Sequence, residues 1–369
     1  MKKFQLALVS LAFLSLSTFQ IQANTAIKVA LILDTSNSMD GLINQAKSQL
    51  WSVVNELSKS ECDGETPDLE IALYEYGNDD LPMREGYIRL VTPFTSDLDL
   101  ISEKLFSLRT NGGSEYCGQV INASLKELDW EEYPKDLKLI FIAGNEPFNQ
   151  GNISYHEVCK TARENDITVN TNFCGNFNEG IQTFWKDGAY IGGGEYMNID
   201  QDCKYVYIKS PYDDKILKLN NALNKTYVTY GSSGKAMYER QAEQDANAYS
   251  LNEEVALKRT ASKSKTAYKN SQWDLVDASE SPDFDISDVP EEDLPDEMKN
   301  MTNKEKEKYI IDKLDERKKI QADINELSKK REQYVNEKRV EDSNNMLDNA
   351  IIQAVKKQAI AKNFRFQED

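Results

Sequence analysis

The residues best suited to chemistry lie in the stretch "LILDTSNSMDG", positions 31–41. Asp34 follows an apolar run, and Ser36 and Ser38 follow Asp34 at two-residue steps. In a loop, alternate side chains can converge on one point, where they would offer one carboxylate and two hydroxyl oxygens. Hard oxygen ligands of this kind suit Mg²⁺. The same residues suit two other roles, because Asp and Ser are favoured helix caps and an activated serine is a nucleophile.

These side chains belong to an alternation of short apolar runs and longer amphipathic stretches. The apolar runs predict strands at 27–33, 69–76, 87–91, 137–143, 167–173 and 204–210. The stretches between them predict helices near 42–59, 97–108, 118–130, 154–165 and 177–187. The alternation predicts an α/β fold, with a doubly wound, mostly parallel central sheet flanked by helices. Ligands bind such sheets at the carboxyl ends of the strands, where Asp34 falls.

Two further loops are expected at the same edge of the sheet. The stretch "NGGSEY" places Ser114 after two glycines, and "IAGNEPF" places Asn145 and Glu146 after an apolar strand. Together with "DTSNS", these loops resemble the von Willebrand factor type A (VWA) domain and its metal-ion-dependent adhesion site (MIDAS). In that family, D-x-S-x-S supplies the first ligands, a Thr or Ser after a Gly-rich turn the next, and an Asp after the fourth strand the last.

The resemblance implies a divalent-cation site for Mg²⁺, or for Mn²⁺ or Ca²⁺. It assigns the ligands Asp34, Ser36, Ser38, Ser114 and Asn145. Asn145 stands where the family usually has Asp, so the site loses one formal negative charge. Glu146 is then the candidate for the second shell, reaching the metal directly or through water.

The family's mode of action implies a binding protein and not an enzyme. A partner protein or peptide would complete the metal's coordination with an acidic side chain, and the metal would bridge two like charges. Two alternatives stay open. One is a metal-independent scaffold in an envelope complex, and the other is a hydrolase that uses Ser36 or Ser38 with His156, the single histidine of the chain.

The N-terminus has the order of a secretory signal peptide, with Lys2 and Lys3 before an apolar run and cleavage expected after Ala23. We therefore expect an exported protein, periplasmic or extracellular. No later segment has enough consecutive apolar residues to span a bilayer. The formal net charge of −18 disfavours nucleic acid as a partner.

All five cysteines lie before residue 204, and none forms a CxxC pair, so a zinc site is disfavoured. An exported chain can oxidise its thiols. Cys117 and Cys174 are both expected near the ligand-binding edge, which makes them the candidate disulfide, with two buried thiols as the alternative.

Beyond the signal peptide (1–23), the sequence divides into a VWA-like domain at 24–230 and a helical segment at 231–273. Residues 274–300 are rich in acidic residues and proline, a composition that favours an extended linker. Residues 301–369 predict two amphipathic helices, a coiled-coil-like tail. The tail has two interpretations. Its apolar positions could bind a partner or a second copy of the chain, or they could pack on their own domain.

Overall fold

The computed structural model describes residues 25–39, 42–131, 133–199, 207–339 and 347–366. The predicted signal peptide and Cys203 lie outside these residues. Within them, no helix is both long and apolar enough to cross a membrane.

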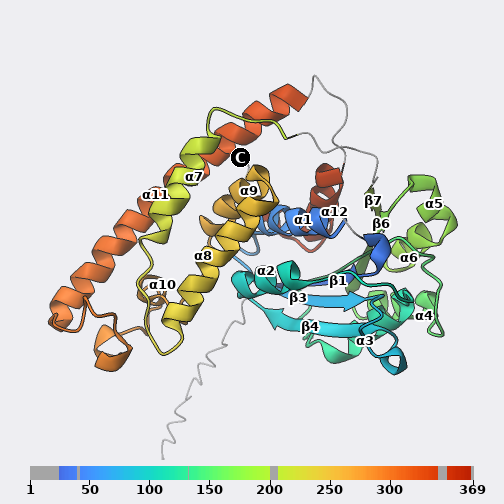
Figure 1. Ribbon diagram of the computed structural model, residues 1–369, viewed down its shortest axis with the longest axis horizontal. Helices are drawn as coiled ribbons and strands as arrows, with labels where there is room; N and C mark the ends of the chain where they lie inside the picture. The colour runs from blue at the N-terminus through green and yellow to red at the C-terminus, as the bar shows by residue number, and fades with distance from the viewer. Residues whose placement is uncertain (1–24, 40–41, 132, 200–206, 340–346, 367–369) are drawn as a thin grey trace, which may run out of the picture.

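A six-stranded sheet forms the centre of the molecule (Figure 1), with the strand order β4-β3-β1-β5-β6-β7. Every neighbouring pair is parallel except β3 with β4. The apolar runs of β1 and β5 are buried along almost their whole length, as expected for inner strands covered on both faces. The predicted doubly wound, mostly parallel sheet is confirmed. The strands are β1 (Ala26–Asp34), β3 (Asp68–Tyr76), β4 (Ile88–Thr95), β5 (Leu137–Gly144), β6 (Ile167–Cys174) and β7 (Gly193–Ile199).

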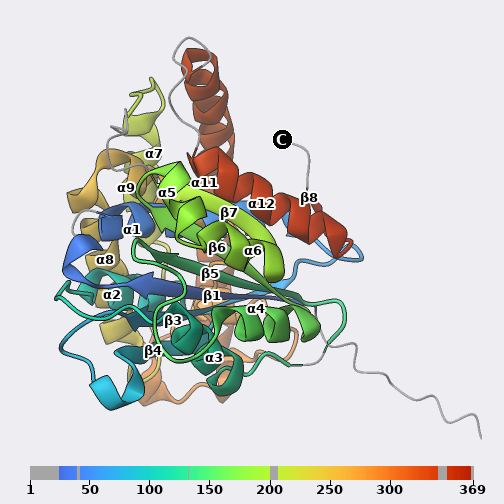
Figure 2. The same ribbon diagram turned by 90° about the vertical axis from the view of Figure 1, so that its right-hand side faces the viewer.

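Helices cover both faces of the sheet (Figure 2), and each face has its own apolar core. The helices on the first face are α1 (Leu42–Leu57), α2 (Leu98–Ser107), α8 (Gly234–Leu251), α9 (Glu253–Lys263) and α12 (Leu347–Ala361). Those on the second face are α3 (Cys117–Glu127), α4 (Tyr155–Glu164) and α6 (Trp185–Ile191). The other short elements of this part of the chain are η1 (Asn37–Met39), η2 (Met83–Glu85), α5 (Phe177–Gln182) and α7 (Asp213–Asn224).

The sixth strand is not where the sequence predicts it. It is β7, a segment whose glycines are more typical of a turn. Of the predicted strand 204–210, residues 207–210 are not in a strand, and 204–206 lie outside the described residues. Glycine is needed here because a Cβ at Gly194 would lie 2.2 Å from the carbonyl oxygen of Val169 on β6. The close approach of two backbones therefore gives this strand a turn-like composition.

The acidic segment 274–300 forms short helical pieces where its composition predicts an extended linker. They are α10 (Leu275–Ala278), η3 (Ile286–Asp288) and η4 (Glu291–Asp293). Val276 and Met298 are fully buried in a third apolar core, which also contains Ile310 of the long helix α11 (Asn303–Arg339). A few well-spaced apolar side chains thus anchor this acidic segment.

The helical tail packs on the rest of the chain. α11 runs along one side of the molecule beside α7 (Figure 1), and α12 packs against α1 and β7. Ile324 of α11 and Val355 of α12 are both 0% exposed and belong to the same core as β1. After α12, the short strand β8 (Arg365–Phe366) pairs with β2 (Ser60–Glu61), which follows α1. Of the two interpretations of the tail, packing on its own domain accounts for these buried residues.

The predicted disulfide is not formed. Cys117 carries a free thiol, buried in the core on the second face of the sheet. Cys174, at the end of β6, is buried in the core on the first face. The two cysteines lie near the same edge, as expected, but the sheet separates their side chains.

Candidate metal centre

The predicted first loop forms a compact cluster of oxygen atoms at the carboxyl end of β1. Asp34 is 0% exposed, and its Oδ1 accepts a hydrogen bond of 2.7 Å from the backbone N–H of Ser36. The hydroxyl oxygens of Ser36 and Ser38 are 2.8 Å apart. The Ser38 hydroxyl donates to Oδ1 of Asn145 at 3.0 Å. The structure therefore brings the first and third predicted loops together.

Backbone hydrogen bonds join the first loop to the loops beside it. The N–H of Thr35 donates to the carbonyl of Tyr76 at 2.8 Å, and the N–H of Asn111 donates to the carbonyl of Thr35 at 3.0 Å. Asn78, only 5% exposed, donates its amide to the carbonyl of Arg109 at 2.9 Å. These bonds fix the conformation of the loop, because each one satisfies a backbone group that burial would otherwise leave unpaired.

Ser114 lies between two residues that contact the rest of the site. A Cβ at its neighbour Gly113 would lie 2.4 Å from the carbonyl oxygen of Gly77, so this loop approaches the loop after β3 closely. Ser114 itself is partly exposed. Glycine at 113 therefore allows the second predicted loop to approach the site, but among the described residues the Ser114 side chain forms no hydrogen bond with the other predicted ligands.

Glu115, which the sequence analysis did not assign, is the second acidic residue of the site. Its side chain is 3% exposed and lies against that of Asp34, since a Cβ at Gly77 would be 2.7 Å from Asp34 Oδ1 and 2.8 Å from Glu115 Cγ. One oxygen of each carboxylate, Asp34 Oδ2 and Glu115 Oε2, is buried without a hydrogen-bond partner among the described residues. Burial raises the pKa of both side chains, and contact with Glu115 raises that of Asp34 further.

Glu146, the predicted second-shell residue, is exposed, and its backbone bonds the Glu115 carboxylate, which partly offsets the effect of burial in raising the pKa of Glu115. Its own carboxylate is held outside the cluster. Its carboxylate accepts from Gln150 Nε2 at 3.1 Å, and its carbonyl accepts from Trp185 Nε1 at 2.8 Å. Its negative charge still reaches the site, where it adds to burial in raising the pKa of Glu115.

His156 lies apart from the two serines. It is exposed on α4, and its Nε2 is 3.9 Å from a carboxylate oxygen of Asp187. The hydroxyls of Ser36 and Ser38 bond each other and Asn145. A serine nucleophile needs a base within hydrogen-bond distance, and His156 does not occupy that position here.

The residues present fit a divalent cation. The site offers two buried carboxylates with unpartnered oxygens, the hydroxyls of Ser36 and Ser38 and the amide oxygen of Asn145, the donor set that Mg²⁺ and Ca²⁺ prefer. Among the residues that the structure describes, no three His, Cys, Asp or Glu side chains form a metal-binding group. A cation here would therefore depend on the hydroxyl and amide oxygens as well as on the carboxylates.

Gly77 provides a direct test of this geometry. We expect Gly77→Ala to abolish Mg²⁺ binding, because the new methyl group would displace the side chains of Asp34 and Glu115. Gly77 has a φ of +76°, so the variant also loses about 1–2 kcal/mol of stability from backbone strain.

The matched control is Gly64→Ala, because Gly64 has a φ of +88° and open space around it. It carries the same strain without the steric clash. Calorimetric titration with Mg²⁺ should show lost binding only in Gly77→Ala, and thermal melts should show destabilisation in both variants, the larger in Gly77→Ala because of its clash. Equal Mg²⁺ affinity in the two variants would contradict the proposed position of the site.

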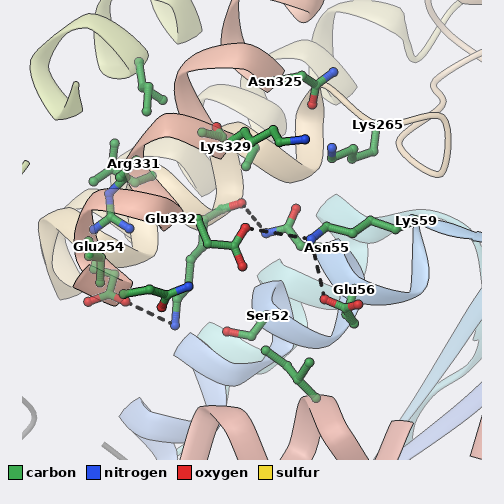
Figure 3. A pocket seen from close by; sticks show the side chains of 18 of the residues that line it. Ser52, Asn55, Glu56, Lys59, Glu254, Lys265, Asn325, Lys329, Arg331 and Glu332 are labelled. Atoms are coloured by element: carbon green, nitrogen blue, oxygen red, sulfur yellow. Dashed lines mark hydrogen bonds and ion pairs between the residues drawn. The ribbon is translucent and has the colours of Figure 1, made fainter. Parts of the chain in front are cut away.

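A pocket of about 370 Å³ lies between the domain and the helical tail (Figure 3), away from the candidate metal centre. Charged side chains from both sides pair with one another across it. Lys59, in the turn after α1, lies 3.7 Å from Glu56 of α1 and 3.9 Å from Glu332 of α11. Lys356 of α12 lies 2.7 Å from Glu56. We interpret this region as an ionic contact between α1 and the tail.

The fold of this chain is similar to that of a known class of domain. An α/β domain with a mostly parallel six-stranded sheet and Asp-x-Ser-x-Ser at the carboxyl end of an inner strand is similar to a VWA domain. No protein-family model matches the sequence, and no curated protein matches it.

Solved structures similar to this chain include VWA domains. The VWA domain of SpRpn10 is 13% identical, with 49% of this chain and 91% of that chain covered and a TM-score of 0.38. BatB from Bacteroides thetaiotaomicron is 17% identical, with 60% and 100% covered and a TM-score of 0.36. Proximal thread matrix protein 1 from the mussel byssus, with a zinc-occupied MIDAS motif, is 11% identical, with 47% and 42% covered and a TM-score of 0.35.

Proposed function

We propose that this chain is an exported binding protein that captures a protein or peptide partner through a divalent cation, Mg²⁺ or a similar ion. The observation that carries the proposal is the convergence of Asp34, Ser36, Ser38 and Asn145 at one edge of the sheet. Their oxygens are suited to hold a cation, and the exposed position of Ser38 leaves the site open on one side.

The metal would supply a positive charge with an open coordination position. An acidic side chain of the partner would occupy that position, and the cation would bridge carboxylates that otherwise repel each other. The role of the chain is to hold its own oxygens in place before the partner arrives, which lowers the entropic cost of binding.

Exposed apolar side chains beside the third loop support a protein partner. Phe177, Ile181 and Phe184 are 46%, 38% and 41% exposed, on and just after α5, the helix that follows β6. The turn after α5 is joined to the third loop, because the N–H of Phe148 donates to the carbonyl of Thr183 at 2.9 Å. Phe177 and Ile181 lie four residues apart on one face of α5, and contiguous exposed apolar residues are typical of interaction surfaces.

The proposal is tested by partner capture from the exported protein fraction. We expect the immobilised chain to retain a partner in Mg²⁺, to release it in EDTA, and to lose it in Asp34→Ala. The matched control is Asp312→Ala, which removes an exposed carboxylate from α11 and should capture the partner normally. Capture that neither EDTA nor Asp34→Ala changes would contradict the proposal and favour the metal-independent scaffold.

A further inference from the structure

The site has a shortage of negative charge if only the residues predicted from sequence hold the metal. Asp34 is then the single carboxylate, since Asn145 replaces the second acidic residue of the related site and Ser36, Ser38 and Ser114 are neutral. Ligand charge is one of the main determinants of divalent-cation affinity. A site of this composition would bind Mg²⁺ weakly.

Glu115 is placed where it would restore that charge. Its side chain is 3% exposed, although it lies in a loop and glutamate is rarely buried without a partner. The absence of a side chain at Gly77 leaves the space in which Glu115 and Asp34 meet. The two carboxylates are thus held side by side from the second and first loops.

No Lys or Arg side chain within the described part of the chain neutralises this pair. Among the described residues, neither Asp34 nor Glu115 forms an ion pair with Lys or Arg, and each keeps one buried oxygen without a hydrogen-bond partner. Two buried carboxylates in contact are unfavourable unless they share a proton or bind a cation. A bound divalent ion would satisfy both unpartnered oxygens and balance both charges.

We propose that Glu115 is a ligand of the divalent cation and supplies the negative charge that Asn145 lacks. This inference rests on the proposed metal site. The alternative for the same geometry is a pair of carboxyl groups that share a proton, in which Glu115 stays neutral and takes no part in holding the metal. The two interpretations make opposite predictions for the amide variant of Glu115.

The test is a Mn²⁺ titration followed by electron paramagnetic resonance, using the mature full chain and five variants. These are Asp34→Ala, Glu115→Gln, Asn145→Asp, the double variant Glu115→Gln/Asn145→Asp, and the control Glu179→Gln on the exposed side of α5. We expect Glu115→Gln to weaken binding at least tenfold and the double variant to recover most of that loss. Asp34→Ala should abolish binding, and Glu179→Gln should leave it unchanged.

The outcomes separate the two proposals. Unchanged Mn²⁺ affinity in Asp34→Ala would overturn the metal site itself. Lost binding in Asp34→Ala, with Glu115→Gln within twofold of the native chain, would overturn only the role of Glu115 and favour the shared proton. Weakened binding in Glu115→Gln without recovery in the double variant would overturn the exchange of charge between positions 115 and 145. Circular dichroism in EDTA checks that each variant is folded.

Discussion

Replacing Asp245 with alanine is expected to lower the free energy of unfolding by about 3–5 kcal/mol, because it breaks a buried ionic network. Asp245, on α8, accepts from Lys263 Nζ at 2.8 Å and from Arg259 Nε at 2.7 Å. Both cations lie on α9 and are nearly inaccessible, with 0% and 1% of their side chains exposed. Arg259 keeps a second partner in Asp99, whereas Lys263, whose side chain is fully buried, would lose its carboxylate partner.

The pH dependence of this effect is also predictable. Burial alone would raise the pKa of Asp245, but Lys263 and Arg259 outweigh it and hold that pKa below its ordinary value of 3.8. A carboxylate with a lowered folded-state pKa contributes stability above its unfolded pKa and loses that contribution as the pH falls. The difference between the native chain and Asp245→Ala should therefore be full at pH 7 and shrink below about pH 4.

Urea unfolding followed by tryptophan fluorescence measures this loss. Asp312→Ala, which removes an exposed carboxylate paired with Lys308 on α11, should change stability by no more than about 0.5 kcal/mol. A loss below about 1 kcal/mol in Asp245→Ala would contradict the account of Lys263 as a buried cation that depends on its ion pair.

Arg317→Met is expected to cost a similar amount, about 3–5 kcal/mol, and to loosen the helical tail. Arg317 of α11 is 2% exposed and pairs through Nη1 with Asp274, at 2.6 Å, and with Asp277. It also donates to the carbonyl of Thr226 at 2.8 Å, and its guanidinium lies 4.1 Å from the centre of the Tyr227 ring. Removing Arg317 would leave the carboxylates of Asp274 and Asp277 without this positively charged partner.

Limited proteolysis distinguishes this result from a general loss of stability. We expect Arg317→Met to be cleaved in segment 274–300 well before the native chain is, since this segment is held by the same ion pairs. The control is the neighbouring variant Lys318→Met, because the side chain of Lys318 is 58% exposed and should be dispensable. Equal cleavage rates in the native chain and Arg317→Met would show that the tail is held by other contacts.

The sequence predicted the parts of the structure that depend on local patterns. Apolar runs such as those of β1 and β5 identify inner strands, and parallel strands place their carboxyl ends at one edge. Asp34, Ser36, Ser38 and Asn145 therefore meet as expected, although more than a hundred residues separate the first from the last.

The missed features depend on contacts between distant residues. Glu115 follows Ser114 directly, and only the conformation of a glycine-rich loop turns its side chain toward Asp34. The composition of segment 274–300 favours an extended chain, but Arg317, far along α11, pairs with two of its acidic residues. Contacts of this kind produce no periodic pattern in the amino-acid sequence.

Diffraction from a crystal soaked with Mn²⁺ would show whether a divalent cation binds between Asp34, Ser36, Ser38 and Glu115. Anomalous scattering from the metal locates it without reference to any assumed ligand. We expect one strong anomalous peak at the carboxyl end of β1, from a metal ion bonded to oxygens of Asp34 and Glu115. No peak at this position under saturating Mn²⁺, or a peak bonded only to other residues, would contradict it.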